Sequence, residues 1–98
     1  MRAFALAAMV AVSSTPALAG PIERACLGSD RPGVSRGVCS CIQQAADITL
    51  SAGDQREAAK FFRDPHQAQV VRQSKRDRDS AFWQRYKRFG EMAAAYCG

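Results

Sequence analysis

The stretch VCSCI at residues 38–42 decides the fold, because two cysteines separated by one residue lie inside a helical pattern. Successive residues of an α-helix are rotated by about 100° around its axis, so Cys39 and Cys41 point about 200° apart. A bridge between them is disfavoured, and each needs a distant partner. The chain supplies two, Cys26 and Cys97. The stretch therefore predicts a helix that is joined to two different neighbours.

Two pairings of the four cysteines remain. They are Cys26–Cys39 with Cys41–Cys97, and Cys26–Cys41 with Cys39–Cys97. The first is favoured, because Cys41 shares its helix face with the apolar residues against which the C-terminal helix is expected to dock. Either pairing closes one short and one long loop, which contributes about 3 and about 4 kcal/mol to stability.

Other uses of the cysteines fit the sequence less well. A zinc site usually takes two close pairs of ligands, and this chain has one Cys-x-Cys and a single histidine, His66. The Cys-x-x-Cys motif of thioredoxin-like proteins is absent. We therefore expect structural disulfides, no metal and no cofactor, with thiol–disulfide redox chemistry as an alternative.

Residues 1–19 have the three-part layout of a secretory signal peptide. Arg2 gives a basic start, residues 3–12 are apolar, and Ala17-Leu18-Ala19 is a small-x-small cleavage site. The apolar run is shorter than the about 20 residues that a membrane-spanning helix needs. We predict cleavage after Ala19 and one small domain at residues 20–98, located in the periplasm, where disulfides persist. A domain of this size has a small hydrophobic core, so covalent cross-links such as disulfides are expected to stabilise it.

Helical periodicity runs through residues 20–98. Ser51 and Asp64 are candidate N-caps, and Ser74 begins a further Ser-x-x-Asp cap. No segment alternates as a strand would. The expected helices are roughly 21–27, 34–50, 51–63, 65–73 and 74–96. The prediction is a small all-α bundle of four to five short helices, stapled by two disulfides.

Apolar residues at helical spacing identify the expected core. One face of the second helix contains Val34, Val38, Cys41, Ile42, Ala45, Ile48 and Thr49. Gln43, Gln44 and Asp47 lie outside it. The third and fourth helices are expected to bury Ala58, Ala59, Phe61, Phe62, Ala68 and Val71. The clearest stripe is Phe82, Tyr86, Phe89, Ala93 and Cys97, flanked by Trp83 and Met92.

The last helix also has basic sides, in a chain whose net charge is +5. Such a surface is typical of a solvated helix face, but it can also steer an acidic protein or an anionic lipid toward the molecule. The candidate partner surface consists of Arg78, Trp83, Arg85, Lys87 and Arg88. Nucleic acid is not an expected partner, because the chain has no known nucleic-acid-binding motif.

No arrangement of residues predicts catalysis. His66 is expected to be an exposed first-turn residue, without the oriented nucleophile that a general base requires. The candidate serines lie in turns, caps or helix starts: Ser29, Ser35, Ser40, Ser51, Ser74 and Ser80. The sequence has no phosphate-binding loop and no acidic metal-binding motif. We therefore expect a protein that is not an enzyme.

Six segments support a resemblance to a known group. They are Ala25-Cys26-Leu27, Val38 to Asp47, Asp54-Gln55-Arg56, Ala58-Ala59-Lys60-Phe61-Phe62, Asp64-Pro65-His66, and Phe82-Trp83 to Tyr96-Cys97-Gly98. Together they resemble a family of small exported alphaproteobacterial proteins. The resemblance covers essentially all of residues 20–98 and implies no established activity. Some members are labelled "arginine transporter", but a chain without a spanning segment cannot form a translocation pathway by itself.

The leading hypothesis is a small periplasmic, non-catalytic binding or accessory protein that acts through a periplasmic or envelope protein. The alternative is a soluble accessory or ligand-binding component linked to arginine transport. The surplus of basic residues argues against capture of a cationic amino acid. A thiol–disulfide redox protein is the third hypothesis.

Overall fold

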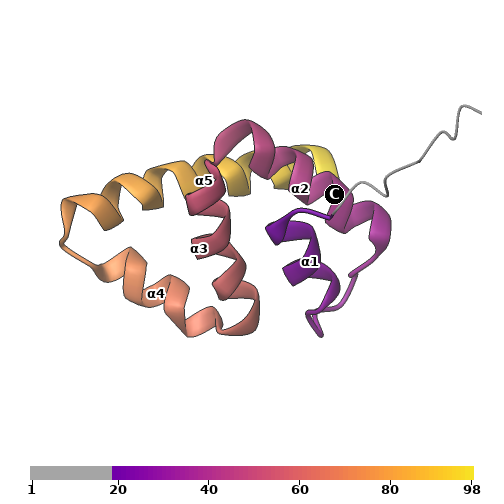
Figure 1. The fold of residues 1–98 in the computed structure, drawn as a ribbon, viewed down its shortest axis with the longest axis horizontal. Helices are drawn as coiled ribbons and strands as arrows, with labels where there is room; N and C mark the ends of the chain where they lie inside the picture. The colour runs from indigo at the N-terminus through magenta and orange to yellow at the C-terminus, as the bar shows by residue number, and fades with distance from the viewer. Residues whose placement is uncertain (1–18) are drawn as a thin grey trace, which may run out of the picture.

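The computed structural model describes residues 19–98, which form five α-helices joined by short loops (Figure 1). No strand occurs in this part of the chain. The predicted signal peptide lies outside the described residues, except for Ala19. The helices are α1 (Pro21–Leu27), α2 (Arg36–Thr49), α3 (Ala52–Arg63), α4 (Pro65–Gln73) and α5 (Asp77–Cys97). The small all-α bundle predicted from the sequence is confirmed.

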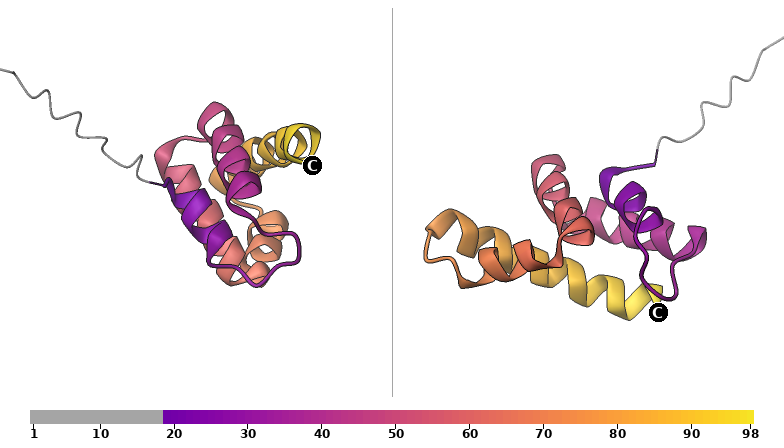
Figure 2. Two further views of the ribbon diagram at one scale, coloured as in Figure 1. Left: turned by 90° about the vertical axis from the view of Figure 1, so that its right-hand side faces the viewer. Right: turned by 90° about the horizontal axis from the view of Figure 1, so that it is seen from below.

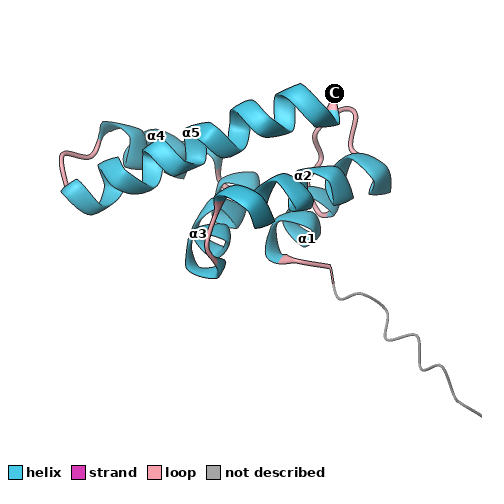
Figure 3. Cartoon of the chain, turned by 90° about the horizontal axis from the view of Figure 1, so that it is seen from above, coloured by secondary structure: helices cyan, strands magenta, loops and turns pink. Residues whose placement is uncertain are grey.

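Helix α5 determines the shape of the molecule. It has 21 residues and is therefore about 31 Å long. Its C-terminal part packs against α2, and α4 folds back beside its N-terminal part (Figures 2 and 3). Helix α1 packs against both α2 and α3. The molecule is thus a compact group of helices at one end and an α4–α5 hairpin at the other.

Both disulfides have the favoured pairing. Cys26–Cys39 joins α1 to α2, and Cys41–Cys97 joins α2 to the end of α5, each with Cα atoms 5.6 Å apart. Cys26 and Cys39 are buried, whereas Cys41 and Cys97 are half-buried. Two such bonds indicate an oxidising environment, either extracellular or periplasmic.

The helix starts agree with the expected caps at two of three positions. The side chains of Ser51 and Asp64 accept hydrogen bonds from the backbone N–H groups of Asp54 and His66. The predicted Ser74-x-x-Asp cap is wrong, because α5 begins after Arg76 and has no side-chain cap. Ser74 instead ends α4, and its hydroxyl donates to Asp79 Oδ2 at 2.6 Å.

The start of α2 also differs from the expectation. It begins at Arg36 rather than at residue 34, because the Ser35 side chain accepts from the Val38 N–H and caps the helix there. Val34 therefore belongs to the preceding loop.

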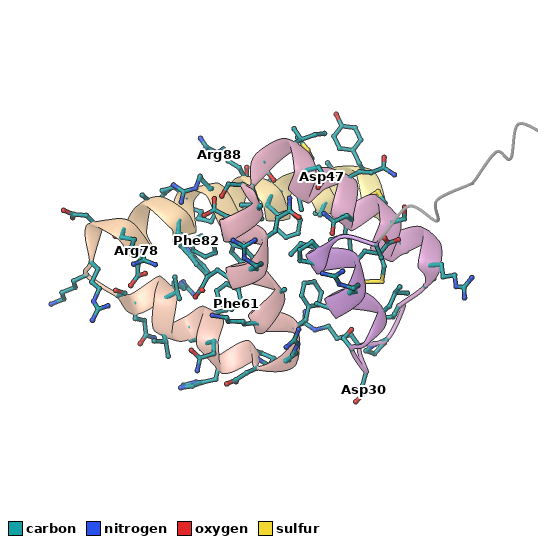
Figure 4. All side chains as sticks on the ribbon, in the orientation of Figure 1. Asp30, Asp47, Phe61, Arg78, Phe82 and Arg88 are labelled. Carbon is teal, nitrogen blue, oxygen red and sulfur yellow. A yellow bond between two sulfur atoms is a disulfide. The ribbon has the colours of Figure 1, made fainter. Side chains whose placement is uncertain are left out.

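An aromatic cluster forms the core between α3 and α5. Phe61 of α3 lies edge-on to Tyr86 at 5.2 Å and to Phe82 at 6.0 Å between ring centroids (Figure 4). Phe61, Phe82 and Phe89 are buried. Burial raises the pKa of the half-buried Tyr86 phenol, as expected for a ring packed among these side chains. The stripe predicted on the last helix is therefore its packed face.

The predicted inner face of α2 needs correction. Gln43 was expected outside the apolar stripe but is 8% exposed, whereas Ile48 was expected inside and is 73% exposed. Gln43 is buried because α2 is covered on two sides, by α1 and by α5, whereas Ile48 lies at a position that no other helix of residues 19–98 covers. A single stripe cannot describe a helix with two buried faces.

Gln43 supplies the N-terminal cap that α1 lacks. The residue before α1 is Gly20, which has no side chain to accept from the first N–H groups of the helix. Gln43 Oε1 accepts instead from Ile22 N at 2.9 Å and from Glu23 N at 3.0 Å. A β-carbon at Gly20 would overlap the Gln43 side-chain amide, so this contact requires glycine.

The same glutamine connects α1 to α3. Its Nε2 donates to Gln55 Oε1 at 2.7 Å and to Asp47 Oδ1 at 2.8 Å. Gln55 Nε2 in turn donates to Asp47 Oδ1 and to the Leu50 carbonyl. Among the described residues, no buried side-chain polar atom is left without a partner. The network therefore fixes α1 and α3 to α2 without an unsatisfied group.

Candidate functional site

The five residues of the predicted partner surface do not share one face of α5. Trp83 and Lys87 are four residues apart and lie on one flank of the helix, whereas Arg78, Arg85 and Arg88 lie on the other. Trp83 is half-buried and packs against Tyr86, with 5.1 Å between the two ring centroids. Arg78, Lys87 and Arg88 are exposed, and Figure 4 labels Arg78 and Arg88 at different points along the helix.

Arg85 is partly exposed and forms an ion pair with α3. Its Nε lies 2.7 Å from Asp54 Oδ2, and its Nη2 lies 3.1 Å from Asp54 Oδ1. The hydrogen bonds from Arg85 hold the pKa of the Asp54 carboxyl below its usual value, despite partial burial. This bidentate pair connects α3 to α5. Arg85 therefore already has an acidic partner within the chain.

A basic cleft lies between α1 and α3. Its volume is about 580 Å³. Four cations line it: Arg24 comes from α1, and Arg56, Lys60 and Arg63 come from α3. The remaining lining residues are small or apolar, namely Pro21, Ala25, Gly28, Ala59 and Phe62. We call this surface the α1–α3 cleft.

The cations of the α1–α3 cleft have little internal neutralisation. Lys60 Nζ lies 3.3 Å from Glu57 Oε2 in an exposed pair, which contributes little. No ion pair involves Arg24, Arg56 or Arg63 within residues 19–98, and all three side chains are exposed. Arg31 is not part of the cleft lining, but its guanidinium carbon lies 5.3 Å from the ring centroid of Phe62, which is part of that lining. The cleft is thus positively charged over an apolar floor.

Sequence reasoning missed this cleft because its two walls are separated by about thirty residues of chain. One signal was present. Arg56, Lys60 and Arg63 recur at i, i+4 and i+7, which places them in one row on α3. The position of Arg24 opposite that row depends on how α1 packs, and the α1–α2 disulfide and the Gln43 cap determine that packing.

A second, apolar groove runs between α2 and α5. Its volume is about 320 Å³, and its lining residues are Cys41, Gln44, Ala45, Ile48, Met92 and Tyr96. Ile48 and Tyr96 are mostly exposed, at 73% and 78%. The groove lies beside the Cys41–Cys97 disulfide, and none of its lining residues is charged.

The residues considered for catalysis are not brought together. His66 is exposed in the first turn of α4. Ser35 and Ser51 act as helix caps, and Ser29 Oγ donates to the Cys26 carbonyl at 2.8 Å. Ser40 lies within α2 and Ser80 within α5. Within residues 19–98, no group of three or more metal-ligating side chains clusters.

The surface of residues 19–98 offers two kinds of binding, namely of anions in the α1–α3 cleft and of apolar groups in the α2–α5 groove. None of the helices in residues 19–98 is long and apolar enough to cross a membrane. Comparison of the chain with protein-family models, with curated proteins and with solved structures found no match.

Proposed function

We propose that this protein is a small, non-catalytic binding or accessory protein of the periplasm that engages an acidic protein partner. The observation that supports this proposal is the α1–α3 cleft, where four cations from two helices line one concave surface. Three of them have no carboxylate partner in the described chain. An acidic partner would neutralise them, and the field of the cleft would steer its approach.

The periplasmic location is supported by two independent features. The two disulfides require an oxidising compartment to form and persist. Residues 1–19 have the pattern of an export signal, with cleavage expected after Ala19. The likeness to small exported alphaproteobacterial proteins agrees with both.

Arg78 and Arg88 provide further exposed cations on α5. Both are exposed on one flank of α5 and have no ion-pair partner among residues 19–98. A folded acidic protein could contact this flank in addition to the cleft. Arg85 is not part of this proposal, because its guanidinium group binds Asp54.

The link to arginine transport is less well supported by this geometry. A free arginine carries a guanidinium group, which the cations of the α1–α3 cleft would repel. Its carboxylate would be attracted, so the cleft would favour acidic over basic amino acids. Titration calorimetry with arginine should therefore give no saturable heat at millimolar concentration, and a saturable signal would favour the transport hypothesis instead.

Crosslinking in the periplasm tests the proposed function directly. The bait is the full chain, and the control bait has glutamine at the four cleft cations Arg24, Arg56, Lys60 and Arg63. We expect the wild-type bait to enrich an acidic protein that dissociates at high salt, because salt screens exposed charges. If both baits enrich the same proteins equally, or if neither enriches any, the proposal is wrong.

A further inference from the structure

We infer that the α1–α3 cleft binds an extended acidic peptide segment, with carboxylates at alternate positions and small apolar residues between them. This inference rests on the proposed function, since it specifies which part of an acidic partner would enter the cleft. The spacing of the cations, the concave shape and small floor residues of the cleft, and the rigidity of its walls all favour such a ligand.

The spacing of the α3 cations fits an extended chain. Along the helix axis, Arg56 and Lys60 are about 6 Å apart, and Arg56 and Arg63 are about 10.5 Å apart. Residues i and i+2 of an extended peptide are separated by about 6.6 Å and point to the same side. Carboxylates at alternate positions would therefore face the row on α3 over about four residues. Arg24 lies on the opposite wall of the cleft. Its long, flexible side chain could bind the backbone carbonyls of the peptide that the α3 cations do not contact.

The shape of the cleft favours a peptide over a flat anionic surface. The cations line a concavity of about 580 Å³, and Ala25 and Ala59 form part of its floor. A membrane surface cannot enter such a concavity, whereas a narrow chain can. The ligand side chains between the carboxylates would point away from α3 toward Pro21 and Ala25 of α1, which leave room for alanine- or valine-sized groups. Burial of these side chains adds affinity that a free phosphate could not obtain.

Three of the four cations are arginines, whose planar guanidinium groups bind carboxylates through two parallel hydrogen bonds. The carboxylates of aspartate and glutamate have the matching geometry. Because phosphate groups share this geometry, an experiment must compare peptide and phosphate directly.

The walls of the cleft are held in place before any ligand binds. Cys26–Cys39 and the Gln43 cap fix α1 to α2, and Gln55 fixes α3 to the same network. A preorganised site loses less conformational entropy on binding than a flexible one. The network therefore supports binding without contacting the ligand.

The test is fluorescence anisotropy of the oxidised protein with a fluorescein-labelled heptapeptide, Ala-Glu-Ala-Glu-Val-Glu-Ala. The variant Arg56→Glu with Arg63→Glu reverses two charges in the cleft. The matched control, Arg72→Glu with Lys75→Glu, reverses two exposed charges that line none of the described clefts. Arg63 and Arg72 both lie in the last turn of their helices, so the two variants change the helix ends similarly.

We expect saturable binding with a dissociation constant below about 1 mM, weakened at least about tenfold by the cleft variant and less than about threefold by the control. The peptide with glutamine in place of glutamate should not bind. Equal weakening by both variants would mean that net charge alone attracts the peptide, and the inference would be wrong.

Two further arms distinguish the source of the anion. The first arm measures binding of tripolyphosphate, and the second measures binding of phosphatidylglycerol vesicles. If either binds the wild type more tightly than the peptide does, and binds the cleft variant more weakly by the same factor, a peptide ligand is ruled out. If the peptide fails to bind while periplasmic crosslinking still enriches an acidic protein through the cleft, the inference fails but the proposed function stands. Circular dichroism of each variant confirms that it is folded.

Discussion

Replacing Gln43 with methionine should destabilise the protein more than any other polar-to-apolar change of similar size. Methionine has nearly the same length and volume, and the two residues have similar helix propensities. The substitution removes four hydrogen bonds, with heavy-atom distances of 2.7, 2.8, 2.9 and 3.0 Å. It therefore isolates the hydrogen bonds from packing.

The expected magnitude follows from the groups that lose their partners. Ile22 N is buried and would have no acceptor, and Gln55 Oε1 would lose its donor. A typical hydrogen bond contributes about 1 kcal/mol, and a buried unsatisfied group costs about 1–3 kcal/mol. Methionine also removes the free-energy cost of burying the polar Gln43 amide, which offsets part of this loss. We expect the free energy of unfolding to fall by about 3 kcal/mol, out of about 4–12 kcal/mol for a domain of this size.

The matched control is Gln44→Met, because Gln44 is the next residue of α2 but is exposed and makes no side-chain hydrogen bond with any other residue of 19–98. Its free energy of unfolding should change by less than about 0.5 kcal/mol. Guanidinium denaturation followed by circular dichroism, with both disulfides intact, measures both variants. A difference of less than about 1 kcal/mol between them would refute the role assigned to Gln43. Gln55→Met provides a second check, because its effect should be less than additive with Gln43→Met.

Three other predictions concern the ion pair, the disulfides and the core. Asp54→Asn should lower stability by about 1 kcal/mol at neutral pH. Because the folded pKa of Asp54 is lowered, its contribution is present above the unfolded pKa of about 4 and is lost below it, so thermal melts of wild type and variant should converge near pH 2. Mild reduction followed by alkylation and mass spectrometry should label the half-buried Cys41 and Cys97 before the buried Cys26 and Cys39. The reverse order would contradict the greater exposure of the Cys41–Cys97 disulfide. Phe61→Ala should destabilise by about 3–5 kcal/mol in denaturation experiments, and the exposed Tyr96→Ala by less than about 0.5 kcal/mol; similar values for both would argue against the aromatic core.

Local features of the sequence were sufficient to predict the helices and the disulfides. Helical phase separates Cys39 from Cys41 on any regular helix and left two pairings, and the apolar face that Cys41 shares favoured the pairing that the structure contains. The stripe from Phe82 to Cys97 is equally local, since one helix presents it to one set of neighbours. These features depend on residues within a few turns of each other, where backbone geometry alone fixes their relative positions.

The features that sequence reasoning missed all depend on packing between distant segments. Gln43 is polar, and it is buried only because α1 brings two unpaired N–H groups to it. Ile48 remains exposed because no helix covers that position. The α1–α3 cleft needs Arg24 opposite a row that begins 32 residues later. No local period encodes such a juxtaposition.

The contact between Gly20 and Gln43 has a consequence for how related sequences can vary. A residue with a β-carbon at position 20 would displace the Gln43 amide and remove the acceptor for the first N–H groups of α1. Serine at position 20 could cap the helix itself, provided that position 43 became small, as in alanine. Evolution can therefore exchange the two arrangements only by changing both positions. Glycine–glutamine and serine–alanine pairs at these sites should be found in related proteins, and serine with glutamine should be avoided.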